Sequence, residues 1–95
     1  MRYIGIDMAS RSFHVSLSEK HVVKFENTQE GIACLIQTLE EKKYSKQKTK
    51  IGVESTGVYH LPLAATLSRR GWSMSVINPL ISSRATTSQR IILRL

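Results

Sequence analysis

Three short segments near the N-terminus have the composition of strands, and only a few residues separate one segment from the next. Residues 2–7 alternate and place Ile4 and Ile6 on one face, residues 13–17 repeat the alternation, and residues 22–25 form a third, short strand. Connections this short can join only antiparallel neighbours, because a parallel pair needs a crossover of roughly a dozen residues or more. The opening of the chain therefore predicts an antiparallel meander of three strands.

The hydrophobic pattern then changes to that of a helix, and strand and helix alternate afterwards. Asn27 and Glu30 have the spacing of a helix cap and its acidic partner, ahead of an apolar helical face. A strand over 51–54, a helix over about 60–70 and a strand over 72–76 follow. Because helical crossovers make the later strands parallel to the first, we predict an α/β fold with a mixed sheet. Its chain order is βββ-α-β-α-β, and its strand order is near 3-2-1-4-5.

The last residues of the chain lack a pattern that would complete this sheet. Residues 86–95 begin polar and end in Ile-Ile-Leu-Arg-Leu, with no helix cap. We therefore expect one domain over residues 1–85 that is incomplete at its C-terminus, followed by a divergent tail. Apolar sheet surface left uncovered would favour self-association, so we also expect a homo-oligomer.

Positive charge is concentrated in the second half of the chain. The sequence holds 14 Lys and Arg against 7 Asp and Glu, a net charge of +7, and no acid follows Glu54. Such a surface suits a polyanion, because lysine and arginine release counterions from phosphates. A solvated basic surface without a partner is the alternative. The candidate nucleic-acid contacts are Lys42, Lys43, Lys46, Lys48, Lys50, Arg69, Arg70 and Arg84.

Two further features bear on the cellular setting. No apolar run approaches the roughly 18–20 residues of a membrane span, and the N-terminus lacks a secretory signal pattern. The single cysteine, Cys34, cannot form an internal disulfide, which is typical of a reducing compartment. We expect a cytoplasmic protein that does not contact membranes.

Two acidic residues end strands that are predicted to lie side by side. Asp7 ends the first strand and Glu54 the fourth, so both carboxylates should emerge at the edge where such sheets bind ligands. Carboxylate oxygens suit Mg²⁺ and Mn²⁺, which nucleases and polymerases use for phosphoryl transfer. Acids at strand ends also cap turns and helix starts. The residues alone leave both interpretations open.

Other chemistries have weaker support. Residues 54–57 precede a helix and permit phosphate binding, but the glycine-rich loops of nucleotide-binding proteins are absent. The histidines and the cysteine lack the spacing of a zinc site. Cys34 is predicted to be a small core residue beside the helical face, and Ser55 lacks the motif around a nucleophilic serine.

Four short segments form a set that identifies a family. They are YIGIDMAS at 3–10, ENT with GI at 26–32, VESTGVYH at 53–60 and VINP at 76–79. Together they resemble the N-terminal catalytic domain of the DEDD transposases of the insertion sequence 110 family and the Piv-type DNA invertases. The resemblance runs over about residues 2–85, and Glu-Ser-Thr-Gly-Val-Tyr is its most specific segment.

This resemblance implies a ribonuclease H-like fold of the Holliday-junction-resolvase kind. It makes Asp7 and Glu54 the first two carboxylates of the DEDD metal site and therefore favours the metal interpretation. It also implies that Mg²⁺ or Mn²⁺ is the cofactor and DNA the substrate. By the same resemblance, we expect a structured guide RNA from the element as a further partner, and a bacterial or archaeal cytoplasm as the location.

The chain also departs from the family pattern. The remaining two aspartates of the family come beyond the asparagine-proline strand end, where residues 86–90 read Thr-Thr-Ser-Gln-Arg and no acid follows. A C-terminal domain with a serine nucleophile is absent as well. We expect weak metal binding and no DNA recombination by this chain alone, whether it is a natural truncation, a frameshifted product or an expression fragment.

The leading hypothesis is thus the N-terminal fragment of a DNA transposase or site-specific recombinase. A non-catalytic nucleic-acid-binding module on the same fold is the alternative, based on the basic second half. An actin-like ATPase fragment also opens with a Gly-Ile-Asp hairpin, but it needs a second phosphate loop and a longer chain.

Overall fold

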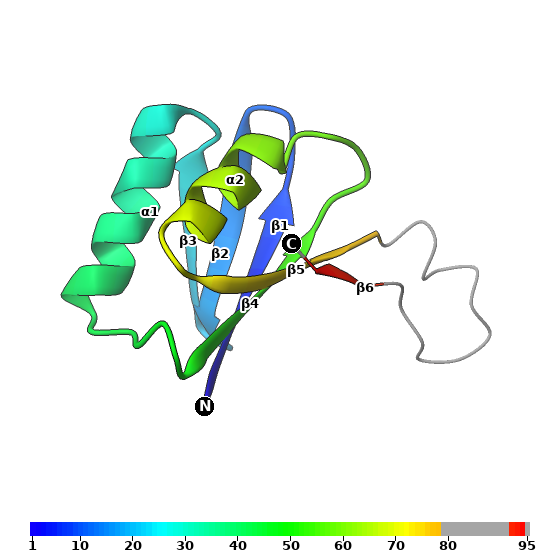
Figure 1. Ribbon diagram of the computed structural model, residues 1–95. Helices are drawn as coiled ribbons and strands as arrows, with labels where there is room; N and C mark the ends of the chain where they lie inside the picture. The colour runs from blue at the N-terminus through cyan, green and yellow to red at the C-terminus, as the bar shows by residue number, and fades with distance from the viewer. Residues whose placement is uncertain (79–91, 95) are drawn as a thin grey trace.

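The described part of the chain, residues 1–78 and 92–94 of this computed structural model, forms six strands and two helices (Figure 1). Strand β2 is antiparallel to β1 and β3, whereas β4 is parallel to β1 and β5. The elements are β1 (Arg2–Met8), β2 (Ser12–Ser18), β3 (His21–Glu26), α1 (Gln29–Glu41), β4 (Thr49–Glu54), α2 (Leu61–Arg69), β5 (Ser73–Ile77) and β6 (Ile92–Arg94).

The strands lie across the sheet in the order β3-β2-β1-β4-β5-β6. The first five confirm the predicted α/β fold, with its mixed sheet, its βββ-α-β-α-β chain order and its ribonuclease H-like arrangement. Helix α1 connects β3 to β4 and α2 connects β4 to β5, so β1, β4 and β5 run in one direction. Their carboxyl ends therefore meet at one edge of the sheet.

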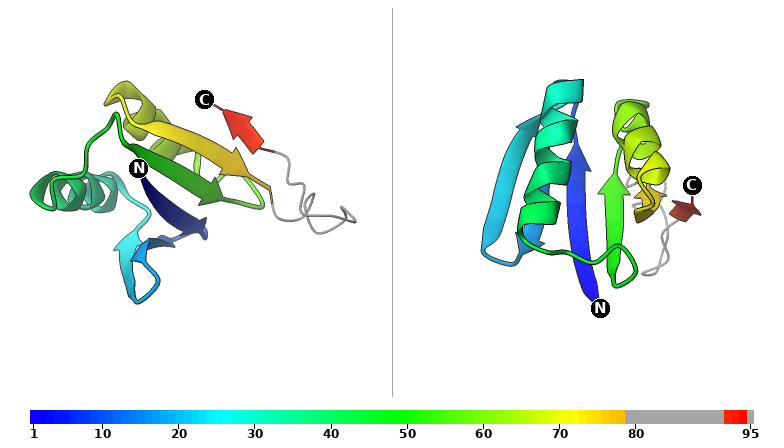
Figure 2. Two further views of the ribbon diagram at one scale, coloured as in Figure 1. Left: turned by 90° about the horizontal axis from the view of Figure 1, so that it is seen from below. Right: turned by 60° about the vertical axis from the view of Figure 1, so that its left-hand side comes forward.

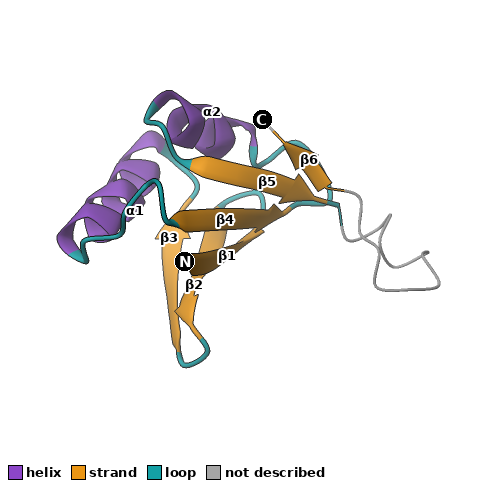
Figure 3. Ribbon diagram, turned by 60° about the horizontal axis from the view of Figure 1, so that its bottom comes forward, coloured by secondary structure: helices purple, strands orange, loops and turns teal. Residues whose placement is uncertain are grey.

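Both helices cover the same face of the sheet (Figure 2). In the described part of the chain, no helix covers the other face (Figure 3). Because side chains alternate along a strand, Ile4 and Ile6 of β1 point into the core beneath the helices. Tyr3 on the other face is 72% exposed. The core consists of Ile4, Ile6, Phe13, Val15, Ile32, Leu35, Ile36, Leu39, Ile51, Val53, Leu63, Ala64, Leu67, Trp72, Met74 and Val76.

Helix α1 begins one residue later than the predicted cap. Thr28, not Asn27, is the N-cap, and its hydroxyl accepts a hydrogen bond from the Gly31 backbone N–H at 3.0 Å. The prediction failed because threonine and asparagine are both good caps, and spacing alone does not choose between adjacent candidates. Asn27 is therefore available for a different role, described below.

Cys34 was also predicted wrongly, since it is exposed rather than part of the core. It follows Ile32 by two residues, which places it roughly 200° around the helix from that buried side chain. Cys34 therefore lies outside the apolar face of α1.

Helix α2 follows the prediction closely. Pro62 lies in its first turn, where a missing backbone N–H costs no hydrogen bond, and Arg69 lies in its last turn. Gly71, just beyond the helix, has φ of 88°, a left-handed conformation that residues with a Cβ atom rarely adopt. The chain then turns into β5 through the buried Trp72.

The sixth strand was not predicted. β6 pairs antiparallel with β5, with Ser75 opposite Arg94, and so extends the sheet beyond the five expected strands. A strand of three residues is too short to show an alternating period, which explains why the sequence pattern gave no sign of it. Within the described residues, neither helix is long and apolar enough to cross a membrane.

Candidate functional site

Asp7 and Glu54 are direct neighbours across the boundary between β1 and β4. Their Cα atoms are partners in the parallel pairing of these strands, which lie about 4.8 Å apart as strands of a sheet do. Partners in adjacent strands project from the same face, so the two carboxylates share one surface. The sheet topology thus brings together two acids that are 47 positions apart in the sequence.

The same row continues on both sides of the acidic pair. His14 of β2 is the partner of Asp7, and Ile77 of β5 is the partner of Glu54. All four residues line one hollow of about 440 Å³, which also includes Val22 of β3. Asp7 is exposed and Glu54 is partly buried, so the pair is accessible from solvent.

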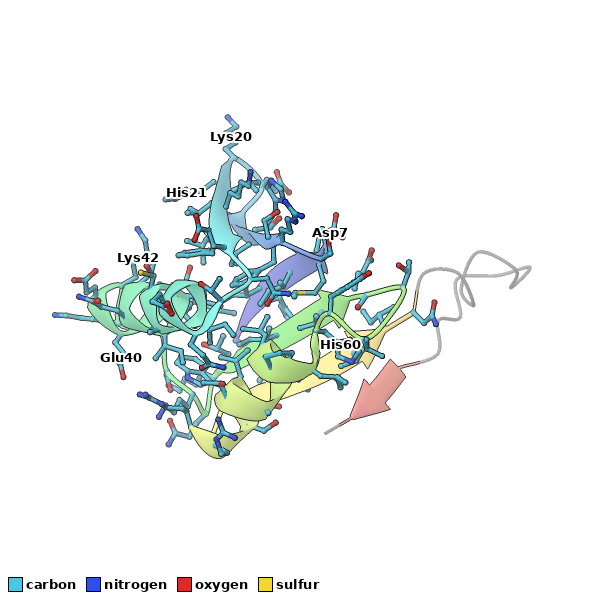
Figure 4. The ribbon with its side chains drawn as sticks, turned by 90° about the horizontal axis from the view of Figure 1, so that it is seen from above. Asp7, Lys20, His21, Glu40, Lys42 and His60 are labelled. Atoms are coloured by element: carbon cyan, nitrogen blue, oxygen red, sulfur yellow. The ribbon has the colours of Figure 1, made fainter. Side chains whose placement is uncertain are left out.

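The acidic pair projects from the face of the sheet that the helices leave open. Figure 4 shows the Asp7 side chain directed away from the helices, whereas His60 lies on the helical side. The floor of the hollow includes Gly5 and Gly52, which are partners on β1 and β4. A Cβ atom at Gly5 would meet nothing closer than 4.0 Å. The floor is therefore low enough for a ligand backbone to approach the carboxylates.

Two carboxylates supply hard oxygen ligands, but they do not complete a metal site. Among residues 1–78 and 92–94, no three His, Cys, Asp or Glu side chains gather closely enough to hold a metal ion. His14 lines the hollow without forming such a group. The donor set thus fits two of the positions around Mg²⁺ or Mn²⁺, both of which accept carboxylate oxygens and commonly keep several waters.

Asn27 connects the loops that surround the acidic pair. Its side-chain Nδ2 donates to the backbone carbonyl of Tyr59 at 2.9 Å and lies 3.4 Å from that of Ser10. Its backbone N–H donates to the carbonyl of Arg11 at 2.9 Å. Three loops, after β1, after β3 and after β4, therefore meet at one side chain. Sequence reasoning missed this role, although Asn27 stands in one of the family-like segments.

Ser55 and His60 hold the loop that follows Glu54. The His60 Nδ1 and Ser55 Oγ atoms are 3.1 Å apart, and Ser55 is buried at 5% exposure. The Ser55 backbone N–H donates to the carbonyl of Ile77 at 3.0 Å, which joins the ends of β4 and β5. The pair thus fixes the chain directly after Glu54.

The predicted nucleic-acid contacts do not lie beside the acidic pair. They gather around the connection from α1 to β4 and the end of α2, at the opposite edge of the sheet. Thr49 and Glu54 are the two ends of β4, five residue steps apart, which is roughly 16 Å of strand. Lys42, Lys43, Lys46, Lys48, Lys50, Arg69 and Arg70 are all exposed, and Arg84 lies outside the described residues. Their contacts with nucleic acid stay a prediction.

Comparison with known proteins identifies the family to which the chain belongs. No curated protein matches the sequence. The family model of the insertion sequence 110 DEDD transposases, described as transposase, matches residues 4–91 and so covers nearly the whole chain, including β1, β4 and both acids. The chain belongs to this family of transposases, whose partner is DNA.

Proposed function

We propose that Asp7 and Glu54 hold a divalent metal ion, Mg²⁺ or Mn²⁺, for the cutting and rejoining of DNA. The observation that carries this proposal is the pairing of the two acids as direct neighbours at the carboxyl ends of parallel strands. A bound divalent ion supplies charge stabilisation for phosphoryl transfer. Both acids line the same hollow, which is where a metal ion and a phosphate would bind.

Electrostatics supports a cation between these acids. Two like charges directly opposite each other in a sheet destabilise it by about 0.2–1 kcal/mol, and a metal ion removes this cost. A pair that lowers stability in the absence of a ligand is typical of a functional site rather than of a structural cap.

A thermal-shift titration with Mn²⁺ tests the proposal. At about ten times the dissociation constant, Mn²⁺ should raise the Tm by about 5–10 °C, because it binds only the folded chain. We expect Asp7→Asn and Glu54→Gln each to lose most of this rise. Asp7→Asn should also melt slightly higher than the natural chain in EDTA, since it removes the repulsion.

Glu19→Gln is the matched control, because Glu19 is an exposed acid in the turn between β2 and β3, far along β2 from the acidic pair. It should keep the full rise in Tm with Mn²⁺. An equal loss of the rise in all three variants would contradict the proposal, because it would show that Mn²⁺ acts through diffuse negative charge.

A second candidate function is nucleic-acid binding without catalysis. The observation that favours it is the position of the exposed basic residues at the edge opposite Asp7 and Glu54. Such binding should persist in EDTA and in the Asp7→Asn variant, and it should weaken steeply with salt. The two functions are compatible, since one uses the carboxyl edge of the sheet and the other uses the amino edge.

A further inference from the structure

A second hollow, of about 250 Å³, lies at the amino edge of the sheet, where β1 and β4 begin. Arg2 enters it from β1, and Lys43 and Lys48 enter it from the connection between α1 and β4. No acidic residue lines it, and the hydroxyl of Ser45, which also lines it, donates to the Gln47 Oε1 atom at 3.1 Å. We call this set of Arg2, Lys43, Ser45, Lys48 and Thr49 the basic hollow.

Two contacts within the fold hold Arg2 in place. The Arg2 backbone N–H donates to the carbonyl of Lys48 at 2.7 Å, which ties the start of β1 to the loop before β4. The Arg2 guanidinium lies 4.6 Å from the centre of the Tyr44 ring. A guanidinium stacked in this way keeps the N–H groups at its edge available for a phosphate.

Lys43 occupies a backbone conformation that is unfavourable for a lysine. Its φ is 61°, and among the described residues it is the one non-glycine residue with positive φ. It follows Lys42, the C-cap of α1, at the position where helices prefer glycine or asparagine. The chain therefore accepts backbone strain at a position that places a long cation in the hollow, as functional sites often do.

We propose that the basic hollow binds one backbone phosphate of duplex DNA, at the end of the sheet opposite Asp7 and Glu54. The choice of DNA rests on the proposed function, whereas the phosphate chemistry rests on the residues of the hollow. Roughly 16 Å of β4 separates the two ends of the sheet.

Lys43→Gly gives the sharpest test, because glycine removes the cation and also relieves the strain. We expect a higher Tm and a roughly 5- to 10-fold weaker affinity for a short mixed-sequence DNA duplex at about 0.1 M salt, with a salt slope reduced by about one. Binding is measured by fluorescence anisotropy in EDTA, so that failure of the metal proposal does not affect the result.

Lys20→Gln is the matched control, because it removes one exposed positive charge from the turn between β2 and β3, which does not line the hollow. It should weaken binding by less than about 2-fold, within the effect of a solvated surface charge. Lys48→Gln should weaken binding as Lys43→Gly does, without a gain in Tm. Equal effects of the Lys20 and Lys43 variants would overturn the discrete site, and a larger loss for an RNA duplex than for DNA would overturn the DNA assignment.

Discussion

Gly31→Ala should destabilise the chain by at least about 3 kcal/mol, at the upper end of the cost of overpacking a core. A Cβ atom at Gly31 would lie 1.8 Å from the backbone carbonyl oxygen of Glu26, which cannot rotate away as a side chain can. Alanine normally stabilises a helix by about 1 kcal/mol relative to glycine, so the sign here is reversed. At about 4–8 °C for each kcal/mol, the Tm should fall by roughly 12–24 °C.

Gly52→Ala is the control for this prediction. Its added Cβ atom would approach the Ile77 Cδ1 at 3.7 Å, an ordinary van der Waals contact, and a strand is more stable with alanine than with glycine. Its Tm, measured by circular dichroism, should be unchanged or higher. A Gly31→Ala variant that melts within a few degrees of the natural chain would contradict the described junction between β3 and α1.

Asn27→Asp should destabilise the chain by about 2–3 kcal/mol, although the two side chains have nearly the same shape. The Nδ2 group of Asn27 faces the carbonyl oxygens of Ala9, Ser10 and Tyr59, and a carboxylate would place a negative oxygen against them. Asn27→Ala removes the donor without adding charge, so it should cost less, about 1 kcal/mol.

Hydrogen exchange measures where this loss acts. The amides of the loops after β1 and β4 should exchange faster in both Asn27 variants, while those of α2 beyond its first turn keep their protection. Thr38→Val is a suitable comparison, because the Thr38 hydroxyl bonds only the Cys34 carbonyl within α1. Equal stability of the Asn27→Asp and Asn27→Ala variants would show that the amide does not donate to these carbonyls.

The sheet was predictable because its strands carry the signal in short, regular patterns. Ile4 and Ile6 alternate with exposed residues, and the helical spacing of Leu35 and Leu39 is equally plain. Tight turns and helical crossovers then leave few topologies, and the observed order is among them. β6 could not be predicted, since its three residues gain their structure from pairing with β5 and not from a local pattern.

The acidic pair was predictable in position, and its surroundings were not. Asp7 and Glu54 end strands that the topology makes neighbours, so their proximity follows from the order of the elements. Whether His14 lies beside Asp7 depends on the register between β1 and β2. A shift of one residue would place the His14 side chain on the other face of the sheet. The hydrogen bond from the Asn27 side chain to the Tyr59 carbonyl joins residues 32 positions apart, so no local sequence pattern indicates it.

Paramagnetic broadening by Mn²⁺ tests the central claim most directly, because its effect falls steeply with distance from the bound ion. In ¹⁵N spectra at substoichiometric Mn²⁺, the amides of Asp7, Met8 and Glu54 should broaden first, and EDTA should restore them. The amide of Thr49, roughly 16 Å away along β4, should broaden much later. Broadening that begins at Glu40 and Glu41, or that is uniform across the chain, would contradict a metal ion held between Asp7 and Glu54.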